Sequence, residues 1–575
     1  MVPMSTRSHS PRGNQMQIHC AEKIESISCN SPEKNRRALQ CVPRSPFLKA
    51  PKSHPHPQDP AERVLTVTRD SHASPSPPPA DPQVLVFGGC IHGEDAGGAA
   101  PKLSGAADAG GGEDRLGALH DDILIRILLK SDDAATAART SVLARRWRHL
   151  WALLPALYFF RPTDPRRIRS ALAAHEAPVL QALAVIAQGD SPGSAGAWLP
   201  IAARRLSGTL VFRVLRRSIA IAKKRAALKL PCFEKATKIV LRLGFLRLAL
   251  PPCGVFTRIH LLMLMEVRLR GPCGLGEAVS SPRCPSLRRL VVKDAHGLGD
   301  LTIHSECLQK LELFRLLDLQ SLTVVAPALQ LLKLDHCFVL CSRQPVANIS
   351  APHLMWLAWM DNYDQNSVQL GEMAYLQSLV TQHFIMYGED YHSSHNRNGV
   401  CLLRHFEHLH RLVLTLQCPK DIANKKYFME QITRLPDIKL LELGITACGH
   451  SFGASLFHVM RMCTAIRALV LGLNVTLEDE AETVCPSDCI CDQPPSWKTE
   501  ELVLNRLEVV EISGFRGTEH EINAVKQICS WATVLRRMTV KFHDSITENK
   551  AEVLCELLVT FSRLGLDMVF IYRMQ

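Results

Sequence analysis

The stretch LRRLVVKDAHGLGDLTIHSECLQKLELFRLLDLQSLTVVAPALQLLKL, residues 287–334, carries one short pattern five times. The pattern is Leu-x-x-Leu-x-Leu or a close variant of it, and its copies begin at Leu287, Leu298, Leu308, Leu319 and Leu329. Successive copies start 11, 10, 11 and 10 residues apart, so that two copies span about 21 residues. A spacing this regular indicates one structural unit that is repeated along the chain.

Each copy of the pattern has the alternation of a half-buried β-strand. On a strand the fourth and sixth positions point to one side and the fifth points to the other. The fifth positions are Val291, Thr302, Glu312, Thr323 and Lys333, which are mostly polar. One unit is too small to enclose a core, but stacked units bury each other's apolar side. Because two copies fall within the 20–29 residues of a leucine-rich repeat, we predict an α/β fold, a curved solenoid with short parallel strands lining one surface.

The pattern continues less regularly on both sides of this stretch. Later copies begin at Leu354, Leu409, Ile438, Ile466, Leu507 and Leu535. Upstream, KIVLRL at residues 238–243 and MEVRLR at residues 265–270 are expected to be early strands. The solenoid is therefore predicted to occupy most of the chain.

Residues 119–151 have a helical periodicity instead. Leu119, Ile123, Leu124, Ile127 and Leu128 form one helical stripe. Polar residues at 131–133 interrupt this stripe and can cap a second helix over residues 134–138. A third helix has Leu143, Trp147, Leu150 and Trp151 on one side. Three helices of this size leave a large apolar surface unpartnered, so the segment is expected to dock onto the rest of the chain or onto another protein.

The segments EDRLGALHDDILIRILL (113–129) and AARTSVLARRWRHLW (137–151) resemble the F-box in the form found in plant F-box proteins. The resemblance implies that the apolar helices dock onto the Skp adaptor of a cullin-based ubiquitin ligase. The residues implied to face the adaptor are Leu116, Leu119, Ile123, Leu124, Ile127, Leu128, Val142, Leu143 and Trp147. His120 stands where the family usually has proline, and Ser131-Asp132 stands where Leu-Pro is typical, and both departures would weaken adaptor binding.

The repeats resemble the leucine-rich region of the same plant proteins. Residues 496–542, SWKTEELVLNRLEVVEISGFRGTEHEINAVKQICSWATVLRRMTVKF, resemble the FBD-type module that closes many of them. In this module Gly514–Gly517 is expected to be a turn and Glu519–Trp531 a helix that leads to a last strand. The implied domains are an F-box at 113–155, a leucine-rich-repeat solenoid at 156–480 and an FBD-like module at 481–575.

Residues 1–112 are rich in proline, serine, histidine and glycine and lack sustained apolar periodicity, so we predict a disordered tail. The formal net charge of the chain is +12, and residues 201–250 alone hold thirteen Lys or Arg against one acid, Glu234. This basic window fits either a solvated face or a patch for an acidic partner or nucleic acid. Neither a secretory segment nor a membrane-spanning run is evident, and the twenty cysteines are scattered. We expect reduced thiols and a protein of the nucleus or cytoplasm, with no membrane partner.

Three patterns in the sequence are candidates for sites of chemistry. Cys485, Cys489 and Cys491 supply three thiols where structural zinc takes four ligands, so reduced loop cysteines are the preferred interpretation. In the histidine-dense residues 391–410, His408 and His410 flank the repeat position Leu409, so we interpret them as solvent-facing positions at a strand edge. Ser191 lies in a Gly-x-Ser-x-Gly match, but Pro192 removes the backbone donor that an oxyanion hole would need. We predict no catalytic residues, no metal site and no cofactor.

The sequence thus predicts a non-catalytic substrate-recognition subunit of an SCF-type ubiquitin ligase. Its F-box would bind a Skp-type adaptor and through it a cullin, and its solenoid would bind a protein target. The alternative is a ligase-independent scaffold that binds protein or nucleic acid through its basic surface.

Overall fold

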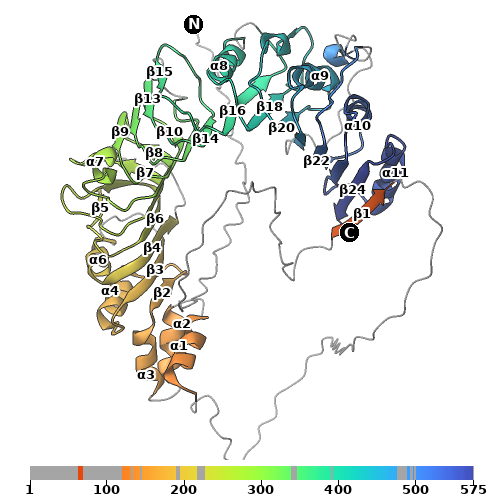
Figure 1. Ribbon diagram of the computed structural model, residues 1–575. Helices are drawn as coiled ribbons and strands as arrows, with labels where there is room; N and C mark the ends of the chain where they lie inside the picture. The colour runs from red at the N-terminus through yellow and green to blue at the C-terminus, as the bar shows by residue number, and fades with distance from the viewer. Residues whose placement is uncertain are drawn as a thin grey trace, which may run out of the picture. The chain divides into compact units, whose positions relative to one another are not determined.

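The computed structural model describes residues 62–68, 119–130, 134–142, 146–188, 195–215, 227–338, 346–389, 393–474, 489–492, 497 and 500–573. The chain divides into two units, Met1–Asp59 and Pro60–Gln575, and every described residue lies in the second. Figure 1 shows the strands and helices of this unit. Its fold is α/β, with mostly parallel strands, as the repeat predicts.

One large sheet joins eighteen of the described strands. These strands are β1 (Glu62–Thr68), β2 (Ala156–Phe159), β3 (Leu180–Gln188), β4 (Leu206–Leu215), β5 (Leu228–Lys229), β6 (Lys238–Ala249), β7 (Leu261–Leu269), β8 (Arg289–His296), β10 (Lys310–Leu316), β12 (Leu331–Asp335), β14 (Trp356–Trp359), β16 (Ser378–Ile385), β18 (Arg411–Gln417), β20 (Leu440–Thr446), β21 (Ala468–Asn474), β22 (Val509–Phe515), β23 (Arg537–Phe542) and β24 (Asp567–Arg573).

Neighbouring strands of this sheet follow the order of the chain. From β2 to β24 each strand pairs in parallel with the next one, except that β4 and the short β5 both pair with β6. The downstream pairs continue in the same sense to β23 and β24. β1 is antiparallel and pairs with β24. Each strand therefore depends mainly on the two beside it, as in other repeat architectures.

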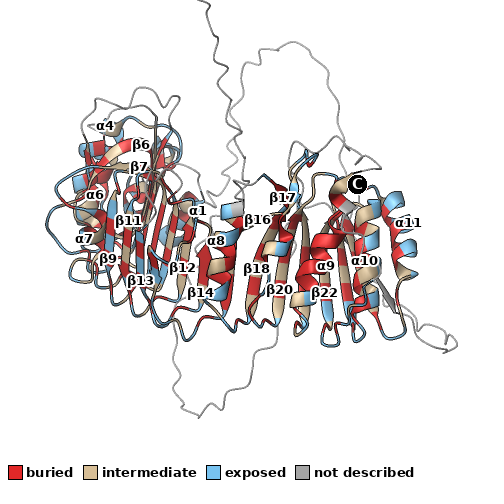
Figure 2. Ribbon diagram, turned by 90° about the horizontal axis from the view of Figure 1, so that it is seen from above, coloured by how far each residue is buried: buried red, intermediate tan, exposed pale blue. Residues whose placement is uncertain are grey.

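The register of these pairs aligns one apolar residue from each strand of the large sheet between β2 and β24, except the short β5. These residues form a continuous buried row, which we call the core ladder. Its members are Leu157, Leu183, Leu210, Ile239, Leu262, Leu290, Leu311, Leu332, Leu357, Leu379, Leu412, Leu441, Leu469, Val510, Met538 and Met568. All of them are buried. Figure 2 shows the resulting alternation of buried and more exposed residues along the strands.

A second sheet accounts for every other copy of the pattern in residues 300–370. It consists of β9 (Asp300–His304), β11 (Ser321–Val325), β13 (Val346–Ser350) and β15 (Val368–Leu370), all parallel. The copies at Leu298 and Leu319 thus belong to this sheet, whereas those at Leu287, Leu308 and Leu329 belong to the large one. The expectation that all copies line one surface is therefore wrong here. One 21-residue repeat is two strands placed in opposite layers, which enclose the leucines between them.

Helices connect the strands of the large sheet and lie along one side of it (Figure 1). They are α4 (Pro165–Ala174), α6 (Leu199–Arg205), α7 (Leu275–Val279), α8 (Ser393–Arg404), α9 (Gly453–Met462), α10 (Glu519–Trp531) and α11 (Glu548–Val559). Shorter elements are the antiparallel pair β17 (Tyr387–Gly388) and β19 (Lys426–Tyr427) and the 3₁₀ turns η5 (Met429–Gln431) and η6 (Ile490–Asp492). The opposite side of the sheet carries no helix among the described residues.

The helical segment before β2 consists of α1 (Asp121–Leu129), α2 (Ala134–Arg139), η1 (Thr140–Val142), α3 (Trp147–Leu150) and η2 (Trp151–Leu153). Its buried residues belong to the same hydrophobic core as those of the sheet. Leu128 and Ala137 meet Leu154 and Tyr158 where the segment joins β2. The segment is therefore docked onto the first strand of the large sheet.

Two other expectations require correction. Residues 62–68, ERVLTVT, form β1 instead of belonging to a structureless tail, because this stretch is rich in strand-forming residues and β24 offers it an open edge. The rest of residues 1–112 lies outside the described residues. The helix expected at Glu519–Trp531 is confirmed, with a capping box made by Thr518 and Glu521. The strand after it is not the last one, since α11 and β24 follow.

Gly453, in the first turn of α9, packs closely against the ring of Trp497. A Cβ atom on Gly453 would lie 2.4 Å from the Trp497 ring, and both residues are buried. We expect Gly453→Ala to lower the free energy of unfolding by about 1–3 kcal/mol because the indole must move. Adding Trp497→Leu should cancel part of that loss relative to Trp497→Leu alone, as measured by denaturant unfolding. Strict additivity of the two changes would contradict the contact.

Candidate partner-binding sites

Helix α1 separates the predicted apolar stripe into a buried and an exposed part. Leu124 and Leu128 are buried in the core, whereas Ile123 and Ile127 are 45% and 43% exposed. Ile123 and Ile127 are four residues apart, so they share one face of the helix. The exposed pair is therefore an apolar surface without cover from the described chain.

The N-terminus of α1 is capped by the histidine that replaces the usual family proline. The ring Nδ1 atom of His120 accepts a long hydrogen bond, 3.5 Å, from the backbone N–H of Asp122. Asp121 and Asp122 add negative charge in the first turn, which stabilises the helix by its favourable interaction with the helix dipole. The departure at His120 thus supplies a side-chain cap in place of the preset backbone angle of proline.

Arg146 joins the start of α1 to α3. Its Nε atom donates to the Asp121 carboxylate at 2.7 Å, and its Nη2 atom donates to the backbone oxygen of Leu119 at 2.5 Å. Both charged side chains are partly exposed, so the ion pair itself contributes only about 0–1 kcal/mol. Its effect is to set the position of α1 relative to α3. Residues 121 and 146 are 25 positions apart in the sequence, so no local sequence pattern predicts this pair.

The remaining residues implied to face an adaptor divide in the same way. Val142 is 87% exposed, Trp147 is buried, and Leu119 is partly buried against the core. Leu116 and Leu143 lie outside the described residues. Leu124, Leu128 and Trp147 pack against the chain itself, and their contact with an adaptor stays a prediction. The apolar surface that remains available is Ile123, Ile127 and Val142.

The helical segment also borders a basic groove. It has a volume of about 750 Å³ and lies between α2, the end of β2 and α4. Four arginines line it, Arg139, Arg161, Arg166 and Arg167, against one acid, Asp164. Asp164 is already engaged, because its carboxylate accepts a hydrogen bond from the backbone N–H of Arg166 and caps α4. The groove therefore favours an acidic surface on a partner.

The helix-free side of the large sheet carries a second candidate surface. Five residues on neighbouring strands adopt left-handed backbone angles: Phe245, Glu266, Asp294, Arg315 and His336, with φ between 46° and 63°. Strand pairing skips Glu266, Asp294 and Arg315, while the residues on either side of them pair with each other, so the three lie at the same level of the sheet. We call this set the left-handed row. Left-handed non-glycine residues are costly and often mark functional positions.

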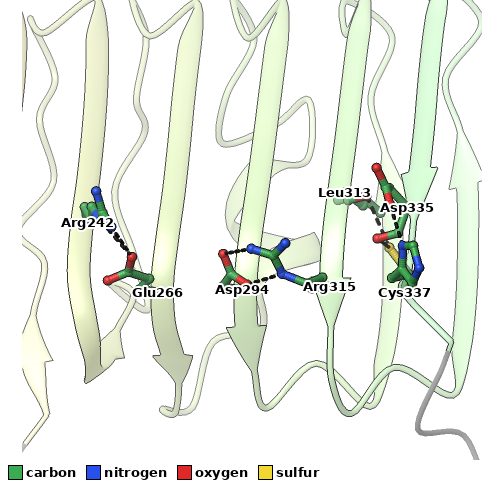
Figure 3. A network of polar contacts seen from close by, with 8 residues as sticks. Arg242, Glu266, Asp294, Leu313, Arg315, Asp335 and Cys337 are labelled. Atoms are coloured by element: carbon green, nitrogen blue, oxygen red, sulfur yellow. Dashed lines mark hydrogen bonds and ion pairs between the residues drawn. The ribbon is translucent and has the colours of Figure 1, made fainter. Parts of the chain in front are cut away.

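Ion pairs hold the side chains of the left-handed row. Arg315 binds Asp294 through two hydrogen bonds of 2.6 and 2.8 Å, and this raises the pKa of the Arg315 guanidinium. Arg242 binds Glu266 at 2.7 Å (Figure 3). Because Arg242 is paired in this way, the basic window of residues 201–250 is partly neutralised where it is described.

Next to the row, the Phe314 ring lies between two lysines. The Nζ atoms of Lys293 and Lys333 are each 4.6 Å from the ring centroid. Together with the row they place alternating charges and one aromatic ring on an otherwise helix-free face. Aromatic residues and arginines are enriched in protein–protein interfaces, so Phe314 and Arg315 are the members of this face that favour contact with another protein.

Two buried carboxylates hold turns and are not part of a reactive site. Asp361 accepts hydrogen bonds from the backbone N–H groups of Cys337 and Phe338 at 2.9 and 3.0 Å. Glu521 accepts from the N–H groups of Arg516 and Gly517, both at 2.8 Å. Burial raises the pKa of both carboxyl groups, and these hydrogen bonds oppose the shift.

The histidine-dense stretch is spread over several elements. His395 lies on α8, where its Nε2 atom is 2.7 Å from the backbone oxygen of His383. Burial, with a smaller contribution from His395, lowers the pKa of His383 to about 4. His408 is 81% exposed and lies 3.8 Å from Asp437. These described histidines do not converge on one point. His392, Ser191 and Cys485 lie outside the described residues.

Among the described residues, none of the helices is both long and apolar enough to span a membrane.

The sequence is similar to one family model and to several known plant proteins. Residues 501–540 match the family model described as FBD, within the region predicted to hold that module. An Arabidopsis thaliana protein named for F-box, FBD and leucine-rich-repeat regions is 25% identical over 452 residues, or 74% of this chain and 87% of its own length. A second, named for an F-box with an associated FBD, is 25% identical over 469 residues, or 78% and 97%. A third, named F-box/FBD/LRR-repeat protein, is 31% identical over 199 residues, or 32% and 44%.

The class of protein is thus the α/β type in which helices precede a parallel leucine-rich sheet. Within that class, the resemblance to plant F-box and leucine-rich-repeat proteins with an FBD module is confirmed.

The division of α1 into buried and exposed positions can be tested by substitution. We expect Leu124→Ala to destabilise the helical segment by about 2–5 kcal/mol, because it leaves a cavity in the core. Ile123→Ala should change stability by no more than about 0.5 kcal/mol, because that side chain is exposed. Hydrogen exchange of the α1 amides in the full chain measures both effects. Equal loss of protection in the two variants would show that the stripe is not divided as described.

The backbone of the left-handed row can be tested at Arg315. Glycine and alanine both remove the guanidinium, but only glycine tolerates a left-handed angle freely. We therefore expect Arg315→Gly to be more stable than Arg315→Ala by about 1 kcal/mol, as measured by thermal unfolding. The matched control is Glu312 on the same strand, where alanine should be the more stable substitution. The same ranking at both positions would contradict the assignment.

Proposed function

We propose that this protein is a substrate-recognition subunit of an SCF-type ubiquitin ligase. The helical segment would bind a Skp-type adaptor and through it a cullin, and the large sheet would bind a protein target. The observation that carries the proposal is the exposed apolar surface of Ile123, Ile127 and Val142 on a segment that resembles an F-box. The names of the similar plant proteins support the same role.

The adaptor contact would combine apolar burial with charge complementarity. Fully burying an isoleucine side chain contributes about 1.5–3 kcal/mol. Ile123 and Ile127 are 45% and 43% exposed, so covering each would contribute a little under half of that. The arginines of the basic groove, which α2 and α4 border, would favour an acidic adaptor. Leu124, Leu128 and Trp147 would hold the exposed residues in place from below.

Such a subunit acts by proximity and contributes no reacting group. Holding the target and the ubiquitin-loaded enzyme in one assembly raises the effective concentration of a target lysine near the enzyme. The left-handed row and the neighbouring Phe314 are the proposed target-binding surface, because their charges and ring are presented on the helix-free side of the sheet. A protein of this role would work in the nucleus or cytoplasm.

Adaptor capture by the full chain tests the proposal. The wild-type chain should co-purify with a Skp-type adaptor, and Ile123→Asp with Ile127→Asp should weaken capture at least tenfold, since each aspartate places a charge in an apolar contact. The matched control is Val553→Asp, which changes a 65% exposed valine on α11. Far-ultraviolet circular dichroism would check that all variants fold.

Three outcomes would contradict the ligase role. These are absence of adaptor capture by the wild-type chain, equal weakening by the Val553 control, and full capture by the double variant. If the wild-type chain captured nucleic acid or another protein but never the adaptor, the scaffold alternative would replace the proposal.

A further inference from the structure

Residues that are distant in the sequence bring three metal-binding groups together beside α9. His450 lies in the loop between β20 and α9, and Cys489 and Cys491 flank Ile490 at η6. The nitrogen of His450 and the two sulfur atoms all lie within 4.8 Å of one another. The sequence alone offered only the thiols, since His450 is 39 residues away from Cys489. The fold therefore adds a third ligand of the type that zinc prefers.

The orientation of the His450 ring suits a metal ligand. Its Nε2 atom lies 2.9 Å from the backbone oxygen of Lys420, which identifies Nε2 as the protonated nitrogen. The other nitrogen, Nδ1, then carries a lone pair and faces the Cys489 sulfur at 3.5 Å. Histidines that bind metals commonly donate their second ring N–H to a carbonyl in this way, because that contact fixes the tautomer and the ring angle.

The cysteine segment is also held in place. The Tyr387 hydroxyl donates a hydrogen bond to the backbone oxygen of Cys491 at 3.2 Å. His450 and Cys491 are buried, and Cys489 is partly exposed. The site is thus largely protected from water but open on one side, where a further ligand can reach it.

The spacing of the His450 nitrogen and the Cys489 sulfur matches that of two ligands on one tetrahedral ion, and the Cys491 sulfur lies within 4.8 Å of both. Zinc bound to sulfur at about 2.3 Å and to nitrogen at about 2.0 Å separates the two ligand atoms by about 3.5 Å. The Cys489 sulfur and the His450 nitrogen are 3.5 Å apart. Two thiolates and a neutral imidazole also balance the charge of a divalent ion, which a largely buried site requires.

We propose that His450 Nδ1, Cys489 Sγ and Cys491 Sγ bind one Zn²⁺ ion, with the fourth position open to water or another donor. Binding converts both thiols to thiolates, forms two zinc–sulfur bonds and one zinc–nitrogen bond, and releases two protons to solvent. The Nε2 proton of His450 stays on its bond to Lys420. The ion would fasten the long connection between β21 and β22 to the loop before α9. This role is independent of ligase function.

Metal binding by the purified full chain tests the site, with Co²⁺ and Zn²⁺ as the probes. The wild-type chain, freed of metal with a chelator under reducing conditions, should bind one Co²⁺ with the absorption of a tetrahedral thiolate complex. Zinc should displace the cobalt, and zinc binding should release two protons per ion. Cys489→Ser, Cys491→Ser and His450→Gln should each weaken binding by about 100-fold or more, because each removes a ligand.

The matched control is Cys529→Ser, which changes a partly exposed cysteine on α10 outside the cluster. This variant should bind Co²⁺ as tightly as the wild-type chain. Circular dichroism of the metal-free chains would establish that all variants are folded. Lack of thiolate-bound cobalt in the wild-type chain would overturn the proposal and leave a thiol–imidazole hydrogen bond. Unchanged affinity in the three ligand variants would overturn it as well, by placing the metal elsewhere.

Discussion

The structure depends on one constraint, the register that keeps a buried apolar residue of each strand against that of the next. The core ladder runs from Leu157 on β2 to Met568 on β24 without a break in the described strands. A slip of one residue in any strand would turn its apolar side chains to the other face. The ladder therefore fixes which side of the sheet is covered by helices and which side is left to contact other molecules.

The same constraint explains how unfavourable local features persist. The left-handed row would be costly in an isolated strand, but the paired residues before and after Asp294 and Arg315 hold it in place. The helical segment shows the corresponding arrangement, because Leu124 and Leu128 join the core and so hold Ile123 and Ile127 at the surface. In both places a buried contact presents exposed side chains at a defined position.

Periodicity predicted the strands well. A strand that is buried on one side alternates apolar and polar residues, and this alternation is visible within a few residues of sequence. The copies starting at Leu287, Leu308 and Leu329 each contain a strand. Periodicity could not show that intervening copies form a second sheet, since both layers bury leucine in the same way. It also missed β1, because the strand that pairs with Glu62–Thr68 is about five hundred residues away.

For the candidate sites too, the local sequence indicated some features, whereas others depend on contacts that only the fold makes. The apolar stripe of the helical segment was readable, but which of its residues face outward depends on contacts with α3 and β2. The pairing of Arg146 with Asp121 and the approach of His450 to Cys489 join residues that no local pattern connects. Charge and ligand type are visible in a sequence, whereas their convergence is a property of the folded chain.

The antiparallel pairing of β1 with β24 adds a strand to the edge of the sheet that β24 would otherwise leave open. A parallel sheet that ended at β24 would present a row of open backbone groups, which invites the addition of strands from other molecules. β1 covers that edge with a strand from the beginning of the same chain. Residues 62–68 thus become the terminal strand of the sheet, and a chain trimmed to start at the helical segment would expose the backbone groups of β24 that β1 now pairs with.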